Sequence, residues 1–210
     1  HPNIFISRMK ETNFFCEDYP ELRKVKTMEE FLELFERAGD QHIAVGEGSV
    51  SNMQSRVAIR RIREFNPDAR LVAILRNAVE MVYALHAQQL YVLNESETDF
   101  EQAWALQEDR AEGRNLPEDL RVPCLLQYRD VGLYGEQVER IFAEFPQGQV
   151  RTYLFEDFIQ WAAQLKLKGV DRIKGDIVID DEIFDGDYLP PGYGQKDEDG
   201  KVFPQHVVHD

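Results

Sequence analysis

Residues 66–90, NPDARLVAILRNAVEMVYALHAQQL, decide the fold class because they contain a turn, a strand and a helix in succession. The Asn-Pro-Asp sequence at 66–68 is a turn signal, and the continuous apolar run at 70–75 is typical of a strand covered on both faces. Asn77 has the spacing to cap a helix over residues 77–90, with a glutamate three residues later. This stretch predicts a parallel sheet with a helix beside it.

The segments on either side continue this alternation of helix and strand. Capping-box spacing and helical periodicity indicate helices, and short apolar runs with β-branched residues indicate strands. The predicted helices cover residues 27–38, 55–65, 77–90, 99–112 and 124–145, and the predicted strands cover residues 42–47, 70–75 and 150–155. Alternation of this kind is the pattern of a three-layer α/β domain, with a parallel sheet flanked by helices.

The character of the sequence changes at Trp161. A short helix is predicted to end near Gly169, residues 173–180 alternate like a strand, and turn signals and an acidic loop follow. We therefore expect a boundary near residue 160, with an α/β domain over residues 1–160 and a short α+β tail over residues 161–210.

Composition excludes several classes of protein. The formal net charge of -15 argues against nucleic acid as a partner, and no stretch approaches the roughly 20 consecutive apolar residues that span a bilayer. Cys16 and Cys124 lie far apart without a metal-ligand spacing, which is typical of a reducing compartment. These features predict a cytoplasmic protein. Because the chain starts at His1 without a methionine, we expect a domain truncated at its amino terminus.

Arg76 is the first candidate for binding an anion. It stands between the strand at 70–75 and the helix at 77–90, where its guanidinium and the free N–H groups of the helix would converge on a bound phosphate. Position alone favours the alternative, an arginine that solvates the end of a strand, because such arginines are common.

Two further pairs of polar residues are candidates for chemistry. Lys10 and Glu11 precede an aromatic pair in a predicted loop, where the carboxylate could take a proton from an acceptor hydroxyl. Glu47 and Ser49 follow the strand at 42–47, at the edge where parallel α/β sheets bind ligands. The alternatives are an exposed charged pair in the first case and a turn or cap role for Ser49 in the second.

Other conspicuous residues have simpler interpretations. Four arginines at helical spacing (56, 60, 61 and 63) favour a solvated helix face over an anion site. His86 is predicted to be structural, and Tyr83 is predicted to belong to the core.

Several segments together resemble the bacterial branch of the PAPS-dependent sulfotransferases, where PAPS is 3'-phosphoadenosine 5'-phosphosulfate. The resemblance covers about residues 1–160, and the segments occur in the family's order. They are HPNIFISRMKETNFF with its Lys-Glu-x-x-Phe-Phe element, AVGEGSVS, FNPDARLVAILRNAVEMVYALHAQQL, LQYRDVGLYGEQVERIFAEFP and VRTYLFEDF.

This resemblance implies a P-loop-like fold and transfer of a sulfuryl group from PAPS to an acceptor hydroxyl or amine. It implies that Arg76 binds the 3'-phosphate, that Glu11 is the general base, and that Lys10 lies near the transferred group. Glu47 and Ser49 would lie on the acceptor side. The implied acceptor is a small molecule, glycan or lipid, and no metal is implied.

Three departures from the family pattern bear on activity. The family's glycine-rich phosphosulfate loop should lie upstream of His1, so we expect this chain to be impaired. Ala84 stands where the family usually has a serine that also binds the 3'-phosphate. The tail from Trp161 resembles a segment of the penicillin-binding D-Ala-D-Ala carboxypeptidases. A non-catalytic nucleotide- or anion-binding remnant and a carboxypeptidase fragment therefore remain alternative hypotheses.

Overall fold

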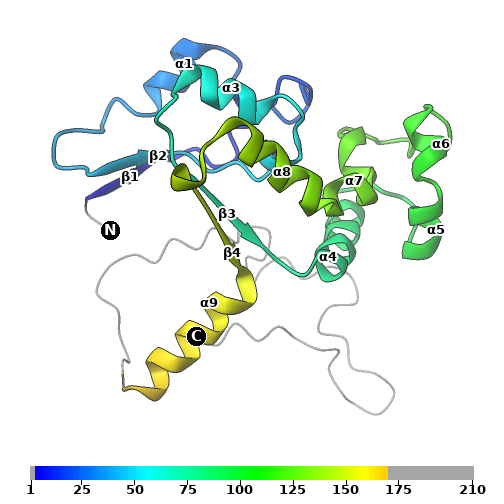
Figure 1. The fold of residues 1–210 in the computed structure, drawn as a ribbon. Coiled ribbons are helices and arrows are strands. Elements are labelled where there is room, and N and C mark those ends of the chain that lie inside the picture. Colours follow the sequence, from blue (N-terminus) through cyan, green and yellow to red (C-terminus); the bar gives the residue numbers. More distant parts are fainter. Residues whose placement is uncertain (1–2, 170–210) are drawn as a thin grey trace. The chain divides into compact units, whose positions relative to one another are not determined.

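The computed structural model describes residues 3–169 (Figure 1). The described chain forms two compact units, one made of residues 3–81 and 129–169 and the other of residues 82–128. Expectations for residues 170–210, including the strand at 173–180, lie outside the described residues.

The first unit contains two pairs of parallel strands. β1 (Ile4–Ile6) pairs with β2 (Ala44–Gly46), and β3 (Leu71–Leu75) pairs with β4 (Val150–Leu154). Within residues 3–169 these pairs are separate two-stranded sheets, so the single sheet predicted from the sequence is not seen there. The parallel direction predicted from the apolar strands is confirmed.

Helices connect and cover these strands. The helices that begin in the first unit are α1 (Met28–Glu33), α2 (Ser51–Gln54), α3 (Ala58–Phe65), α4 (Ala78–Tyr91), α8 (Tyr134–Glu144) and α9 (Phe155–Leu167). Shorter elements complete the chain: α5 (Phe100–Ala105), α6 (Gln107–Ala111), α7 (Tyr128–Gly132) and the 3-10 turns η1 (Pro123–Leu126) and η2 (Gln147–Gln149). α9 runs through residue 160, where the sequence suggested a boundary.

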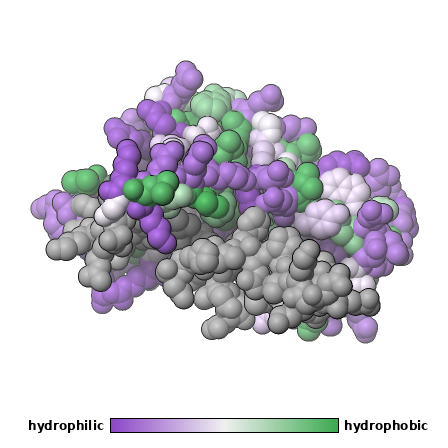
Figure 2. All heavy atoms as spheres, turned by 90° about the horizontal axis from the view of Figure 1, so that it is seen from below, coloured by the Kyte–Doolittle hydropathy of each residue, from purple (hydrophilic) through white to green (hydrophobic). Residues whose placement is uncertain are grey.

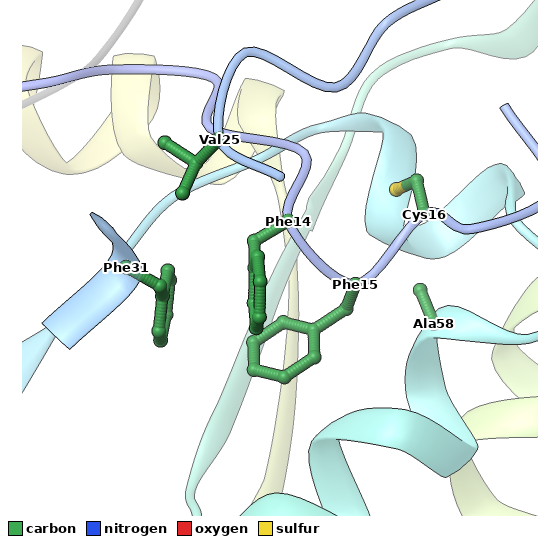
Figure 3. Close-up of a cluster of buried hydrophobic side chains, with 6 residues drawn as sticks. All are labelled: Phe14, Phe15, Cys16, Val25, Phe31 and Ala58. Carbon is green, nitrogen blue, oxygen red and sulfur yellow. The ribbon is translucent and has the colours of Figure 1, made fainter. Parts of the chain in front are cut away.

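An aromatic cluster forms one part of the first unit's core (Figure 3). Phe14 stacks on Phe31 with ring centroids 4.4 Å apart, and Phe15 meets both rings edge-on. Cys16 and Ala58 close the cluster, and both are fully buried. Because Phe14 lies three residues after Glu11, the core fixes the end of the loop that carries Lys10 and Glu11, the candidate catalytic loop.

A second apolar cluster supports the strand pair β3–β4. Its buried members come from α3, β3, α8 and the start of β4: Ile59, Ala73, Ile141, Phe145 and Val150. α8 also contacts α2 through Arg140, whose Nη2 donates to the carbonyls of Met53 and Gln54 at 3.1 and 3.2 Å. This packing holds the end of β3 in place.

The second unit is helical. Its long helix α4 buries Val82, His86 and Gln89, which lie along one stripe of the helix. His86 is 5% exposed and its Nε2 lies 2.8 Å from the Glu97 carbonyl, which confirms a structural role. Tyr83 is 51% exposed, so its assignment to the core is wrong; it projects one position away from the buried stripe.

Several element predictions need correction, and the helix expected over residues 99–112 is divided into α5 and α6. The helix expected at 27–38 ends at Glu33, because the following residues form i to i-3 hydrogen bonds, for example from Phe35 N–H to the Leu32 carbonyl. The helix expected over residues 124–145 is divided into η1, α7 and α8. The strand β1 was not predicted, because three residues show little alternation.

On the face in Figure 2, hydrophilic side chains cover much of the described surface and apolar side chains form smaller patches between them. Arg60 and Arg61 of α3 are exposed and bind carboxylates, as in the pair Arg61–Glu17 at 2.8 Å, which agrees with the predicted solvated helix face. Arg63 differs: it is half-buried, lies over the Phe145 ring and donates to the Pro67 carbonyl at 2.9 Å. Across residues 3–169 there is no helix with the length and apolar character needed to cross a membrane.

Candidate active site

The candidate catalytic loop follows β1, at the end where the carboxyl termini of β1 and β2 meet. Backbone hydrogen bonds join it to the loop after β2. The Ser7 N–H donates to the Gly46 carbonyl at 3.1 Å, and the Glu11 N–H donates to the Gly48 carbonyl at 3.2 Å. With Phe14 and Phe15 packed in the core, the segment carrying Lys10 and Glu11 is held on both sides.

Glu47 and Ser49 are part of this arrangement. The Thr12 hydroxyl donates to Glu47 Oε1 at 2.6 Å, and the Ser49 hydroxyl donates to the same oxygen. Ser49 Oγ accepts the Asn13 N–H at 2.9 Å. Thr12 and Asn13 are buried, whereas Glu47 and Ser49 are half-buried. The structure therefore brings Glu47 and Ser49 beside the residues that follow Glu11.

Glu11 itself has an unusual backbone conformation. Its φ is 51°, and Asn13 has a φ of 49°, so two non-glycine residues close together adopt the left-handed region. Such conformations persist where surrounding contacts fix them, and they gather at functional sites. Glu11 Oε2 accepts the Val50 N–H at 2.9 Å, so the half-buried carboxylate is oriented by the loop after β2. An oriented carboxylate can accept a proton from a hydroxyl within hydrogen-bond reach.

Lys10 precedes this carboxylate and is half-buried. Its carbonyl accepts a hydrogen bond from Lys24 Nζ at 3.0 Å, so a second ammonium group lies against the backbone of the loop. The loop therefore combines a carboxylate with nearby positive charge, which is the combination that transfer of an anionic group requires.

Arg76 lies where the sequence predicted, directly after β3. Its side chain is 16% exposed, and Nη2 lies 3.4 Å from Glu80 Oε2. The sequence predicted free N–H groups at the start of α4, but this is wrong, because three of these N–H groups are hydrogen-bonded. Asn77 Oδ1 accepts the N–H groups of Val79 and Glu80 at 3.0 and 3.3 Å, and the Asn77 N–H donates to Glu156 Oε1 at 3.0 Å. An anion at this strand end would therefore be bound by the Arg76 guanidinium rather than by these three N–H groups.

Tyr134, at the start of α8, lies near the same turn. Burial raises the pKa of the Tyr134 phenol; the charge of Arg76 opposes this increase and the charge of Glu156 adds to it. These effects place Arg76, Tyr134 and Glu156 within one electrostatic neighbourhood at the end of the strand pair β3–β4.

Sequence reasoning missed Thr12, Asn13 and Glu156. Glu156 had a usable signal, because it closely follows an apolar strand, as Glu47 and Arg76 do. Thr12 and Asn13 had none beyond their place next to Glu11, since their partners lie more than 30 residues away. Within the described part of the chain, no group of three or more His, Cys, Asp or Glu side chains could hold a metal ion.

Comparison with solved structures identifies a bacterial neighbour. The crystal structure of a sulfotransferase from Alicyclobacillus acidocaldarius matches this chain with a TM-score of 0.67 and 29% sequence identity. The match covers 79% of this chain and 68% of that chain. This chain is similar in fold to a sulfotransferase.

A second similarity concerns the end of the chain. Residues 149–205 match the D-Ala-D-Ala carboxypeptidase 3 (S13) family, which agrees with the resemblance of the tail. The matched segment begins before Trp161 and includes β4 and α9, so it overlaps the part of the chain that resembles sulfotransferases. No curated protein sequence matches the chain.

Proposed function

We propose that this chain is a sulfotransferase that transfers the sulfuryl group of PAPS to a hydroxyl or amine of an acceptor. The observation that carries the proposal is the structural similarity to a bacterial sulfotransferase at 29% identity over 79% of the chain. The oriented carboxylate of Glu11 and the position of Arg76 after β3 support it. The acceptor proposed is a small molecule, glycan or lipid.

PAPS, when bound, supplies a sulfuryl group on a phosphate leaving group. In this proposal the Arg76 guanidinium binds the 3'-phosphate, because its planar fork of donors suits a phosphate oxygen pair. Glu11 accepts the proton of the acceptor hydroxyl, while the Val50 N–H keeps its carboxylate in position. Lys10 contributes positive charge near the sulfuryl oxygens. In-line transfer needs this positioning and charge more than a covalent intermediate.

Two features of the sequence lower the activity that we expect. The glycine-rich phosphosulfate loop of the family does not occur among the 210 residues, and with it a lysine and a nest of N–H groups are missing. Ala84 replaces a serine that would donate a second hydrogen bond to the 3'-phosphate. We therefore expect weak nucleotide binding and slow or undetectable transfer by this chain alone.

The test measures binding of adenosine 3',5'-bisphosphate and of adenosine 5'-monophosphate by calorimetry. The bisphosphate should bind more tightly, and Arg76→Ala should weaken it by roughly tenfold to a hundredfold, the value of a hydrogen bond to a charged group. Arg76→Lys keeps the positive charge but loses the planar pair of donors. Its affinity for the bisphosphate should therefore lie between those of the unmodified chain and Arg76→Ala. Equal binding of the bisphosphate with and without Arg76 would contradict the site assignment.

Transfer is tested separately with radiolabelled PAPS and a panel of hydroxyl and amine acceptors. Any transfer that is detected should be abolished by Glu11→Gln, which keeps the shape of the side chain but removes its basicity. Tight nucleotide binding with no transfer to any acceptor would favour the alternative of a non-catalytic binding remnant.

The match of residues 149–205 to carboxypeptidases favours a second function, a fragment of a peptidase. This segment contains no serine and therefore cannot supply the nucleophile of a Ser-x-x-Lys element. Elsewhere the chain does contain Ser7-Arg8-Met9-Lys10, but Ser7 is 5% exposed and its hydroxyl donates to the Met9 carbonyl. We expect no labelling by a fluorescent β-lactam; labelling that is lost in Ser7→Ala would revive the peptidase hypothesis.

A further inference from the structure

The parallel register of β3 and β4 brings two distant charged residues to one edge of the strand pair. Leu75 pairs with Leu154, so both strands end at the same level. Arg76 follows Leu75 directly, and Glu156 lies two residues after Leu154, in the first turn of α9. Residues that are 80 positions apart in the chain are thereby neighbours at the edge proposed to bind the nucleotide.

Glu156 uses this position to hold the turn between β3 and α4. Its Oε1 accepts the Asn77 N–H at 3.0 Å, a contact between the two strand ends. Asn77 in turn caps α4, because its Oδ1 accepts the N–H groups of Val79 and Glu80. Hydrogen bonds therefore hold the backbone on both sides of Arg76. The β3–β4 ladder holds it before Arg76, and the hydrogen bond from the Asn77 N–H to Glu156, here called the clamp, holds it after Arg76.

The Arg76 side chain is 16% exposed and contacts Glu80. Its contact with Glu80 is long, at 3.4 Å, and Glu80 is about half exposed. The backbone of residues 75–77, which Glu156 holds through the Asn77 N–H, sets the point at which the Arg76 side chain leaves the sheet.

We propose that Glu156 is a positioning residue for Arg76, which aims the guanidinium at the phosphate of the bound nucleotide by clamping the Asn77 N–H. The inference rests on the proposed function for its ligand and on the hydrogen bond for its mechanism. It assigns a role to Glu156, which was not among the site residues predicted from the sequence.

Glu156 could act through its negative charge or through its hydrogen bond to the Asn77 N–H, and these two roles predict different effects of substitution on the affinity for the bisphosphate. A carboxylate near a phosphate repels it, so a role through charge alone would make Glu156→Gln and Glu156→Ala both bind the bisphosphate more tightly. The clamp needs only an acceptor oxygen, which glutamine retains and alanine lacks. Asp157 offers a matched control, because it is the next acidic residue in the same first turn of α9.

The experiment compares the full chain with Glu156→Ala, Glu156→Gln and Asp157→Asn. Affinities for adenosine 3',5'-bisphosphate and adenosine 5'-monophosphate are measured by calorimetry, and melting temperatures are recorded. Glu156→Ala should lose about tenfold in affinity for the bisphosphate and keep its affinity for the monophosphate. Glu156→Gln and Asp157→Asn should stay within about twofold of the unmodified chain for both ligands, within the scatter of surface changes.

Hydrogen exchange of the Asn77 amide, followed by NMR, tests the clamp without any ligand. The amide should exchange at least about tenfold faster in Glu156→Ala than in the unmodified chain and Glu156→Gln. Unchanged exchange overturns the clamp, and equal losses for both nucleotides overturn the specific role toward the phosphate. If the unmodified chain binds the two nucleotides equally, the proposed function fails, while the exchange experiment still decides whether Glu156 holds Asn77.

Discussion

A buried ion pair in the second unit gives the sharpest prediction about stability. Glu95 and Arg110 form a bidentate pair at 2.6 and 2.7 Å, with side chains that are 0% and 2% exposed. The Tyr128 hydroxyl donates to Glu95 Oε2 at 2.7 Å, and the N–H groups of Ser96 and Glu97 donate to Oε1 at 2.8 and 2.9 Å. The Glu95 carboxylate therefore accepts five hydrogen bonds from four residues.

Arg110→Met removes one partner and leaves the other charge buried. Burial alone raises the pKa of Glu95, but the hydrogen bonds from Arg110, from the two backbone N–H groups and from Tyr128 outweigh it and lower the pKa below its ordinary value. Breaking a buried pair in this way costs about 3–5 kcal/mol. Tyr128→Phe removes only one hydrogen bond to the carboxylate and should cost about 1.5–3 kcal/mol.

Urea unfolding followed by circular dichroism at pH 7 measures these losses. The pH dependence adds a second check. Because the folded pKa of Glu95 lies below its unfolded value, the stability it contributes is present above the unfolded pKa and is lost as the pH falls through the folded pKa. The difference between the unmodified chain and Glu95→Gln should therefore shrink in acid. A cost of less than about 1 kcal/mol for Arg110→Met would refute this reasoning, since that is the range of ordinary surface changes.

Two smaller predictions concern the first unit. Burial is the main cause that raises the pKa of Cys16 to about 12. In a Cys124→Ser background, the reaction of Cys16 with iodoacetamide at pH 8 should therefore be more than about tenfold slower in the native state than in urea. Equal rates in the two states would show that the native thiol is accessible. Thr12→Val removes a donor from Glu47 and should lower the free energy of unfolding by about 1.5–3 kcal/mol, with Thr12→Ser recovering most of it in thermal denaturation. An unchanged melting temperature in Thr12→Val would mean that this bond does not hold the loop.

The elements that the sequence predicted well are those with a strong local signal. The strand predicted at 70–75 is β3, and the helix predicted at 77–90 is α4, because a turn, an apolar run and an Asn cap mark their limits. The capping box of Thr27 and Glu30 is also present. By contrast, the apolar periodicity of residues 124–145 continues across the breaks between η1, α7 and α8, so periodicity alone could not find them.

One expectation about β3 was wrong for a different reason. A continuous apolar strand predicts cover on both faces, yet Val72 and Ile74 are 65% and 50% exposed, while Ala73 between them is buried. The apolar pattern of a strand indicates which of its residues can be buried. Whether they are buried depends on which segments, distant in the sequence, pack against the strand. Within residues 3–169 the strand pair receives cover on the face of Ala73 from α3 and α8.

The candidate site shows the same limit. The rule that ligands bind after parallel strands selected Glu47, Ser49 and Arg76 from the sequence, and the structure does place them at strand ends. The rule could not show that Glu47 and Ser49 hydrogen-bond to the loop of Glu11, because this depends on the pairing of β1 with β2 and on left-handed backbones at residues 11 and 13. Nor could it connect Glu156 to Asn77, since that contact exists only when β4 pairs with β3 in one register. A shift by one residue in that register would move Glu156 about 3.3 Å along the strand and break the clamp while leaving every local sequence signal intact.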